Sequence, residues 1–116
     1  MAQEKTHAML TESALVLVAA RFRALGDPAR LMIVNRLMNG ELPVQDLLRE
    51  TGLSQTNLSR HLGILRRSGI VERRSEGNRA FYRVGDPSLI EVCELVCGSL
   101  AERLAHDLEA FAGADI

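Results

Sequence analysis

The chain has no tryptophan and few aromatic residues of any kind, only 3% of its 116 residues. A core without large rings must be built from Leu, Val, Ile and Ala, and such cores are often helical or completed by a partner subunit. No apolar run reaches the roughly 18 residues that cross a bilayer. The start of the chain has neither a basic n-region before a long apolar stretch nor a clear cleavage site. We therefore expect a cytoplasmic protein without a membrane segment.

Cysteine is equally scarce, because Cys93 and Cys97 are the only two. Two closely spaced cysteines do not make a secretory disulfide framework, and in the cytoplasm both are expected to be reduced. The three histidines, at positions 7, 61 and 106, are dispersed along the chain. The sequence also lacks a nucleophile–base arrangement, a glycine-rich phosphate loop and an HExxH pattern. These absences argue against an enzyme.

The net charge of −1 conceals a strong segregation of charge along a chain that is long enough for one domain. Residues 1–53 are balanced, whereas residues 54–83 carry seven arginines and two glutamates. Residues 84–116 carry one arginine and seven acids, so the middle segment has a charge of +5 and the last one −6. A basic middle third, rich in arginine and without lysine, predicts a surface that binds a polyanion.

Helix signals dominate the first two thirds of the chain. The first helix is expected over 11–25. The second lies in "GDPARLMIVNRLMNG", with Asp27 as N-cap, Pro28 as first helical residue and Gly40 as stop. Segment 43–68 holds a short helix in "LPVQDLLRETG" and a longer one in "LSQTNLSRHLGILRRSG", joined by a short turn that contains glycine. This is the helix-turn-helix arrangement.

A hairpin and a long helix complete the expected fold. Residues 70–84 contain two β-compatible runs around "SEGN", in which Gly77 and Asn78 suit a tight turn. A second Asp-Pro opening then starts a long helix over 86–112. Residues 1–116 are therefore expected to form a single, mainly α domain of about five helices with a small β-hairpin.

The fourth predicted helix carries a face suited to DNA. Leu58, Leu62 and Leu65 recur at i, i+4 and i+7 and form its buried stripe. The opposite face offers hydroxyls, an amide and guanidinium groups, which suit base edges and phosphates in a major groove. With the N-cap, these candidate DNA-binding residues are Ser54, Gln55, Thr56, Ser59, Arg60 and Arg67. His61 lies beside the stripe, so we expect it to pack or to form a hydrogen bond rather than to read bases.

The hairpin adds three more candidate DNA-binding residues around its turn, Arg73, Arg74 and Arg79. Their guanidinium groups suit contacts with a minor groove or with the DNA backbone, because each offers a planar fork of donors. Taken alone, such a hairpin is also compatible with an ordinary solvated surface. The hairpin follows directly after the helix-turn-helix segment, and this position favours the interpretation that it binds DNA.

Three motifs carry a family resemblance: "LGDPARL", "LSQTNLSRHLGILRRSGIV" and "EGNRAFYRV". Over residues 20–85 the chain resembles the winged-helix repressors of the ArsR/SmtB family. The resemblance implies a homodimeric bacterial repressor in which the fourth helix reads double-stranded DNA and the hairpin at 70–84 is the wing. It also implies that 11–25 and 86–112 are dimerisation helices and that the operator is an imperfect inverted repeat.

Repressors of this family release DNA when a metal, a metalloid or an oxidant binds, and the resemblance locates their usual sensor positions. The third helix reads "ELPVQDLL" here and lacks the cysteines of the arsenic sensors. The zinc-ligand places of the last helix hold no histidine. They are occupied by Asp86, Ser88, Ser99 and Glu102. A known thiol switch is absent too, because its cysteine places correspond to Asn35 and Ala101, and the recognition helix has no cysteine.

Cys93 and Cys97 therefore remain as the candidate metal or thiol sensor, one turn apart on an apolar stripe of the last helix. The rest of that stripe is Leu89, Val96, Leu100, Leu104, Leu108 and Phe111. One interpretation is that both cysteines are small apolar residues of a subunit interface. Another is that two copies of the pair bind a thiophilic ion such as As(III), Zn, Cd or Cu(I), with His7 as a further ligand. A third is oxidation to an intersubunit linkage or a sulfenic acid.

The leading functional hypothesis is a sequence-specific DNA-binding transcriptional repressor that a thiophilic ion or an oxidant releases from its operator. One alternative is a winged-helix repressor without a metal site. Another is a winged-helix module that binds RNA or an acidic protein. Tight binding to an inverted repeat distinguishes the first two from the third, for which weak, sequence-independent binding of nucleic acid is expected.

Overall fold

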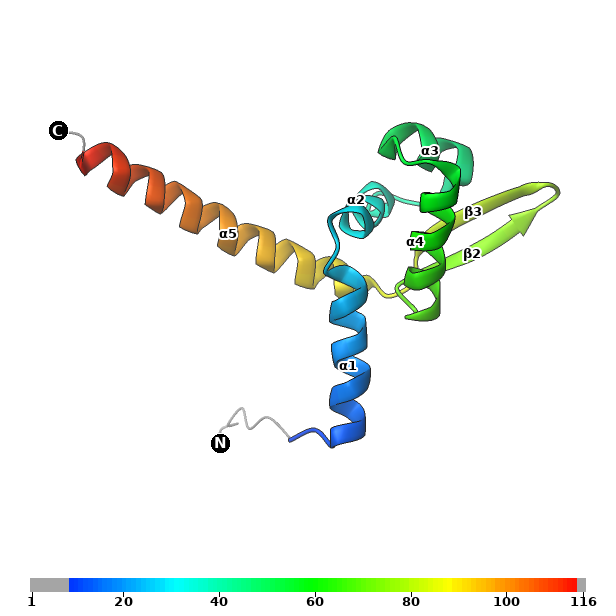
Figure 1. Cartoon of the computed structure of the whole chain (residues 1–116), viewed down its shortest axis with the longest axis horizontal. Helices are drawn as coiled ribbons and strands as arrows, with labels where there is room; N and C mark the ends of the chain where they lie inside the picture. The colour runs from blue at the N-terminus through cyan, green and yellow to red at the C-terminus, as the bar shows by residue number, and fades with distance from the viewer. Residues whose placement is uncertain (1–8, 115–116) are drawn as a thin grey trace. The chain divides into compact units, whose positions relative to one another are not determined.

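The computed structural model of the chain describes residues 9–114, which form five helices and a three-stranded sheet (Figure 1). In chain order the elements are α1 (Glu12–Leu25), α2 (Pro28–Leu37), β1 (Leu42–Pro43), α3 (Val44–Thr51), α4 (Gln55–Arg67), β2 (Val71–Glu76), β3 (Arg79–Val84) and α5 (Pro87–Ala114). The chain divides into two compact units, one ending at Val84 and one beginning at Gly85. The five helices and the hairpin confirm the predicted mainly α fold with a wing.

The start of α2 is fixed by its N-cap. The Asp27 carboxylate accepts hydrogen bonds from the backbone N–H groups of Ala29 (2.8 Å) and Arg30 (3.2 Å). These N–H groups have no partner inside the helix, so the cap satisfies them and Pro28 follows as the first helical residue. Both assignments were predicted. The helix ends before the predicted stop at Gly40, whose φ of 142° belongs to the loop that leads into β1.

Both ends of α4 lie where the sequence predicts them. The Ser54 hydroxyl accepts a first-turn N–H at 3.1 Å. At the other end, Gly69 has a left-handed φ of 76° and donates to the carbonyl of Arg66 (3.0 Å), while Ile70 donates to that of Leu65 (2.9 Å). This is the Schellman motif, in which a left-handed glycine lets two carbonyls of the last turn be satisfied. The motif ends α4 and turns the chain, so that β2 follows directly.

The sheet contains one strand more than predicted. Its order is β1-β3-β2, all antiparallel, with β2 and β3 forming the predicted hairpin around Gly77. In β1, Leu42 pairs with Tyr82 and Pro43 with Phe81. Pro43 was expected at the start of the third helix, which instead begins at Val44. A two-residue strand carries no periodicity, and proline is tolerated at such an edge because it has no N–H to donate.

The core of the first unit is aliphatic and joins α2, α3, α4 and the sheet. Its most deeply buried side chains are Ile33, Val34, Leu37, Leu47, Leu58, Leu65, Ile70 and Val71. The predicted stripe of α4 is confirmed, because Leu58, Leu62 and Leu65 are all buried. The opposite face of α4 is thereby directed to solvent, since a helix that buries one stripe exposes the residues across its axis.

α1 and α5 differ from this core, because each exposes large apolar side chains. On α1 they are Leu15, Val16, Leu17, Val18 and Phe22, and on α5 they are Leu95, Val96, Leu100, Leu104 and Leu108. α5 begins after Asp86, as expected, and extends beyond the predicted end at 112. The side chain of Phe111 lies outside the described residues. No helix within residues 9–114 is long and apolar enough to span a membrane.

Candidate nucleic-acid interface

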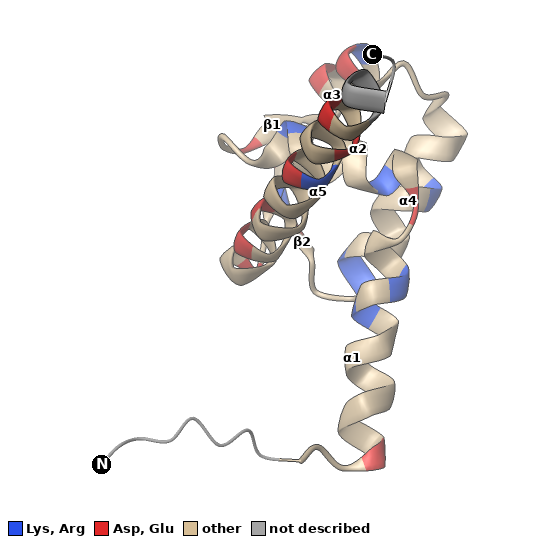
Figure 2. Cartoon of the chain, turned by 90° about the vertical axis from the view of Figure 1, so that its left-hand side faces the viewer, with Lys and Arg blue, Asp and Glu red and all other residues tan. Residues whose placement is uncertain are grey.

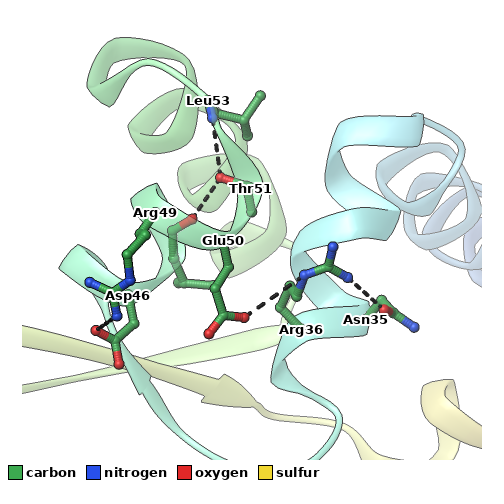
Figure 3. Close-up of polar contacts among 8 residues, drawn as sticks. Asn35, Arg36, Asp46, Arg49, Glu50, Thr51 and Leu53 are labelled. Carbon is green, nitrogen blue, oxygen red and sulfur yellow. Dashed lines mark hydrogen bonds and ion pairs between the residues drawn. The ribbon is translucent and has the colours of Figure 1, made fainter.

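The turn between α3 and α4 is fixed by one threonine and one glycine (Figure 3). Thr51 Oγ1 donates to the carbonyl of Leu47 (2.7 Å) and accepts the N–H of Leu53 (3.3 Å). Gly52 has a left-handed φ of 71°, which a side chain would strain. These local bonds set the angle at which α4 leaves α3, so they position the helix that carries the candidate DNA-binding face.

α3 is also connected to α2 (Figure 3). Arg36 Nε lies 3.8 Å from Glu50 Oε1, and the same guanidinium donates to Asn35 Oδ1 at 2.9 Å. Within α3, Arg49 pairs with Asp46 at 2.8 Å. These pairs are exposed, so each stabilises the unit only slightly. Together they help to keep α3, the scaffold of the turn, in register with α2.

α4 presents the predicted polar face to solvent. All six of its candidate DNA-binding residues are exposed, and the helix contains no acidic residue (Figure 2). They are Ser54, Gln55, Thr56, Ser59, Arg60 and Arg67. The face therefore combines uncharged donors and acceptors at the start of the helix with positive charge farther along.

His61 is buried on the opposite side of α4, with 5% of its surface exposed. Its Nδ1 lies 3.1 Å from Arg30 Nη1 of α2. This confirms the expectation that His61 packs and forms a hydrogen bond. Burial, followed by the charge of Arg60, lowers its pKa, and Asp27 partly opposes that shift. No local pattern in the sequence indicates that Arg30 is the partner of His61.

The two faces of the wing differ in charge. Antiparallel pairing places residues directly opposite each other on the same face. One face carries Arg73, Ser75, Ala80 and Tyr82. The other carries Glu72, Arg74, Glu76, Arg79, Phe81 and Arg83. The second face therefore contains all the acidic residues of the hairpin, and two of its three arginines, Arg74 and Arg83, form ion pairs with them.

Arg74, one of the predicted DNA contacts, is held by two carboxylates. Its Nε and Nη2 donate to the two oxygens of Glu41 (3.1 and 2.8 Å), and Nη1 donates to Glu76 (3.2 Å). The guanidinium also lies 4.5 Å over the Phe81 ring. The bond from Arg74 lowers the pKa of Glu41, and the two carboxylates raise that of Arg74. Its charge is thus neutralised at the point where β1, β2 and β3 meet.

Arg73 and Arg79 are different, because neither forms an ion pair within the part of the chain that the structure describes. Arg73 Nη1 donates to the neutral hydroxyl of Ser75 at 2.9 Å. Arg79 lies 5.1 Å from the Phe81 ring centre and is exposed. Of the three predicted wing contacts, these two keep positive charge available for a phosphate. The alternation of "VERRSE" places Arg74 beside Glu72 and Glu76, but nothing local indicates Glu41.

Cys93 and Cys97 are free thiols on α5, the first half-buried and the second exposed. Partial burial, and then the neighbouring Cys97, raises the pKa of the Cys93 thiol, which lowers its thiolate fraction. Among the described residues, no group of three or more His, Cys, Asp or Glu side chains is placed to hold a metal ion. His7, the suggested third ligand, lies outside the described residues. One chain therefore supplies two candidate ligands.

The fold and the exposed face of α4 agree with a known family. The model of the family described as "Bacterial regulatory protein, arsR family" matches residues 27–73, from the cap of α2 into the wing. The HTH-type transcriptional regulator Rv0081 of Mycobacterium tuberculosis is 36% identical over 84% of this chain and 86% of its own length. The chain belongs to the ArsR family. It is a DNA-binding transcriptional regulator and not an enzyme, as the sequence predicts.

Solved structures of ArsR-type proteins share the fold. The crystal structure of M. tuberculosis Rv0081 has a TM-score of 0.76 at 34% identity, over 84% of this chain and 99% of that one. The homodimeric winged helix-turn-helix domain of Mycobacterium bovis Mb0332, solved by NMR, gives 0.76 at 32%, over 86% and 95%. The transcriptional repressor BigR from Xylella fastidiosa gives 0.67 at 36%, over 73% and 87%.

Proposed function

We propose that the protein is a homodimeric transcriptional repressor that binds an imperfect inverted repeat in double-stranded DNA. The observation that carries this proposal is the exposed face of α4, which is free of acids and lies opposite a buried leucine stripe. Hydroxyl, amide and guanidinium groups on such a face match the donors and acceptors of a major groove. The relatives named as repressors, among them the BigR of X. fastidiosa, support repression as the mode of regulation.

The exposed apolar side chains of α1 and α5 support the dimer. A second copy that covers them would remove a large apolar area from water, which is the main driving force for association. The homodimeric state of the M. bovis relative supports the same assembly. A two-fold axis would present two copies of α4 to half-sites about 34 Å apart, one turn of DNA, and so requires an inverted repeat.

In this proposal α4 reads bases and the wing binds the DNA backbone through Arg73 and Arg79. Arg74, with two carboxylate partners, keeps the wing attached to β1 instead. Phosphate contacts fix the position of a protein on the duplex, while base contacts specify the sequence. The two regions are therefore expected to respond differently to substitution.

The test begins with selection of a binding sequence by the wild-type protein from random duplex DNA. Arg60→Ala should then weaken binding of the selected duplex about tenfold to a hundredfold, because a base-reading guanidinium is lost. Arg23→Ala is the control, since Arg23 is an exposed arginine at the end of α1, outside both α4 and the wing. Unchanged affinity of Arg60→Ala would reject its role. Equal affinity of the wild type for selected and random duplexes would favour the RNA- or protein-binding module.

We further propose Cys93 and Cys97 as the inducer site, for a thiophilic ion such as As(III), Zn, Cd or Cu(I), or for an oxidant. Both thiols are free and lie on one face of α5, one of them exposed. Two copies of the pair in a dimer offer up to four soft ligands, the number that tight binding of such ions usually requires.

A DNA-release assay tests the inducer site. Arsenite, zinc, cadmium, copper and peroxide are each added to the wild type and to a Cys93→Ser, Cys97→Ser double variant on the selected duplex. The proposal expects one of them to release the wild type and to leave the variant bound. Release of both proteins, or of neither, would contradict it and would favour a repressor without a metal site.

A further inference from the structure

The guanidinium of Arg30 joins three helices of the first unit. Arg30 belongs to the first turn of α2, and its Nε donates to the carbonyl of Ala24 in the last turn of α1 (2.6 Å). Its Nη2 lies 3.5 Å from the carbonyl of Arg23 in the same turn. Its Nη1 lies 3.1 Å from Nδ1 of the buried His61 on α4. One side chain thus connects the end of α1 with the recognition helix.

The distances to two guanidinium groups indicate the protonation state of His61. Guanidinium groups only donate and a neutral imidazole has one acceptor nitrogen, so either Nδ1, 3.1 Å from Arg30, or Nε2, 3.4 Å from Arg60, accepts. The shorter distance favours Nδ1 as the acceptor from Arg30. The neutral ring then carries its proton on Nε2, which lies 3.4 Å from Arg60 Nη2. Two N–H groups face each other there and form no hydrogen bond. Arg60, a candidate base-reading residue, is thereby left without a bond to the ring and is free to turn toward DNA.

We propose that Arg30 is a positioning residue for DNA binding, which sets α4 against α1 through neutral His61, and that protonation of His61 breaks this link and weakens binding. The inference rests on the proposed DNA-binding function and adds a coupling between two of its parts. α1 carries an apolar face assigned to the dimer and α4 the face assigned to DNA. Arg30 is a residue through which the position of one helix affects the other, beside the direct contacts between α1 and α4.

The charges around His61 determine the direction of the effect. α4 contributes the cation Arg60, α2 contributes Arg30 and its cap Asp27, and the last turn of α1 contributes carbonyl groups and the exposed Arg23. A protonated ring has no lone pair for Arg30 and places a third cation between two guanidinium groups. Burial opposes the charged ring as well and lowers its pKa. The link is therefore intact at neutral pH and is lost only as the pH falls through a pKa below the ordinary histidine value.

Two variants and one control test the proposal on the duplex selected by the wild type. Arg30→Met should weaken binding about tenfold at neutral pH, because the donors are lost while a flexible, unbranched apolar side chain takes the place of the aliphatic part. His61→Asn keeps an acceptor near the position of Nδ1 but cannot titrate, so it should bind nearly as well as the wild type. Wild-type affinity should fall as the pH drops below about 6.5, whereas that of His61→Asn stays level. His106→Gln, an exposed histidine of α5, should retain the wild-type profile.

Nitrogen NMR of the imidazole rings provides a measurement that needs no DNA. In the wild type, His61 should carry its proton on Nε2 at neutral pH and titrate below the ordinary histidine range, and in Arg30→Met this preference should be lost. A proton on Nδ1, or equal pH profiles for wild type and His61→Asn, would overturn the proposal. If Arg30→Met fails to fold, the wild-type NMR spectrum and the pH profile of His61→Asn still test the proposal. A wild type that selects no sequence would refute the proposed function, while the NMR result would judge the Arg30–His61 link separately.

Discussion

In the unit that ends at Val84, α2, α3, α4 and the sheet bury their aliphatic side chains against one another, and Leu47 is fully buried. In the other unit, α5 exposes apolar side chains along its length, with Leu95 exposed at 74%. Both units contain leucine at similar helical spacing. The first unit therefore has its own core, whereas α5 has an apolar face that only another surface can cover.

The two units also differ in charge (Figure 2). α4 carries arginines and no acid, while residues 84–116 carry one arginine and seven acids. DNA is a polyanion, so α4 attracts it and α5 repels it. The proposed surface for nucleic acid and the proposed dimer surface therefore differ in charge, and substitutions in the two should have different consequences.

The largest effect is expected from the apolar face of α5. Leu100→Glu with Leu104→Glu should separate the dimer into monomers and weaken DNA binding more than about a hundredfold, because the two half-sites are then bound independently. Sedimentation and DNA titration measure the two effects. Glu102→Gln, between them on the same helix, is the control and should remain dimeric. A double variant that stays dimeric would contradict the role of α5.

A pair of identical substitutions compares the two units directly. Leu47→Ala should reduce the free energy of unfolding by about 2–5 kcal/mol, because it leaves a cavity in a closed core. Leu95→Ala, made in the Leu100→Glu, Leu104→Glu background that prevents dimerisation, should change it by less than about 0.5 kcal/mol, because that side chain is exposed in the single chain. Urea unfolding followed by circular dichroism measures both. Equal losses for the two variants would contradict this difference between the units.

The wing offers a smaller and more specific contrast. Arg73→Ala should weaken binding to all sequences and reduce the slope of log affinity against log salt by about 0.9, the value for one phosphate contact. Arg74→Ala should leave the slope unchanged, because Glu41 and Glu76 already neutralise that guanidinium. It should instead loosen the contact between β1 and β2. A lower slope for Arg74→Ala would show that it leaves its carboxylates to bind DNA.

The smallest effect is expected at the cap of α2. The backbone N–H of Arg30 lowers the pKa of Asp27 below its ordinary value of 3.8; burial opposes this shift, and the N–H of Ala29 adds to it. The folded state therefore prefers the carboxylate, so its contribution to stability is present above that pH and is lost as the pH falls through the lower folded pKa. Asp27→Asn keeps an acceptor and should reduce this acid-dependent loss. Unfolding temperatures measured from neutral to acid pH would show an unaltered slope if the cap charge has no role.

Much of the fold could be predicted because its signals are local. Asp27, Ser54 and Gly69 mark helix ends through bonds to backbone groups a few residues away, and they do so in the structure. The buried stripe and the exposed polar face of α4 follow from a period of 3.6 residues. The short β1 was missed because two residues carry no period, and Pro43 was consequently placed in the wrong element.

The candidate site was predicted less completely. Exposure of the α4 residues follows from the helix period, but the availability of a wing arginine does not. The guanidinium of Arg74 is bound to the carboxylate of Glu41, 33 positions away in the chain. That of its neighbour Arg73 is bound only to the neutral hydroxyl of Ser75. Cys93 and Cys97 share a face of α5, yet no further ligand from the described residues joins them. That site depends on a second copy of the chain.

Local sequence patterns were sufficient to predict the five helices and the hairpin of this protein, their order, the basic face of α4 and the apolar face of α5. These follow from caps, periodicity and charge, which act over one or two helical turns. Which polar side chains are bound by other side chains, and which are available to a ligand, depends on the tertiary structure. Arg30 meets His61 across 31 positions and Arg74 meets Glu41 across 33. Such bonds depend on how helices and strands pack, because hydrogen-bond geometry changes over fractions of an ångström that no local pattern specifies.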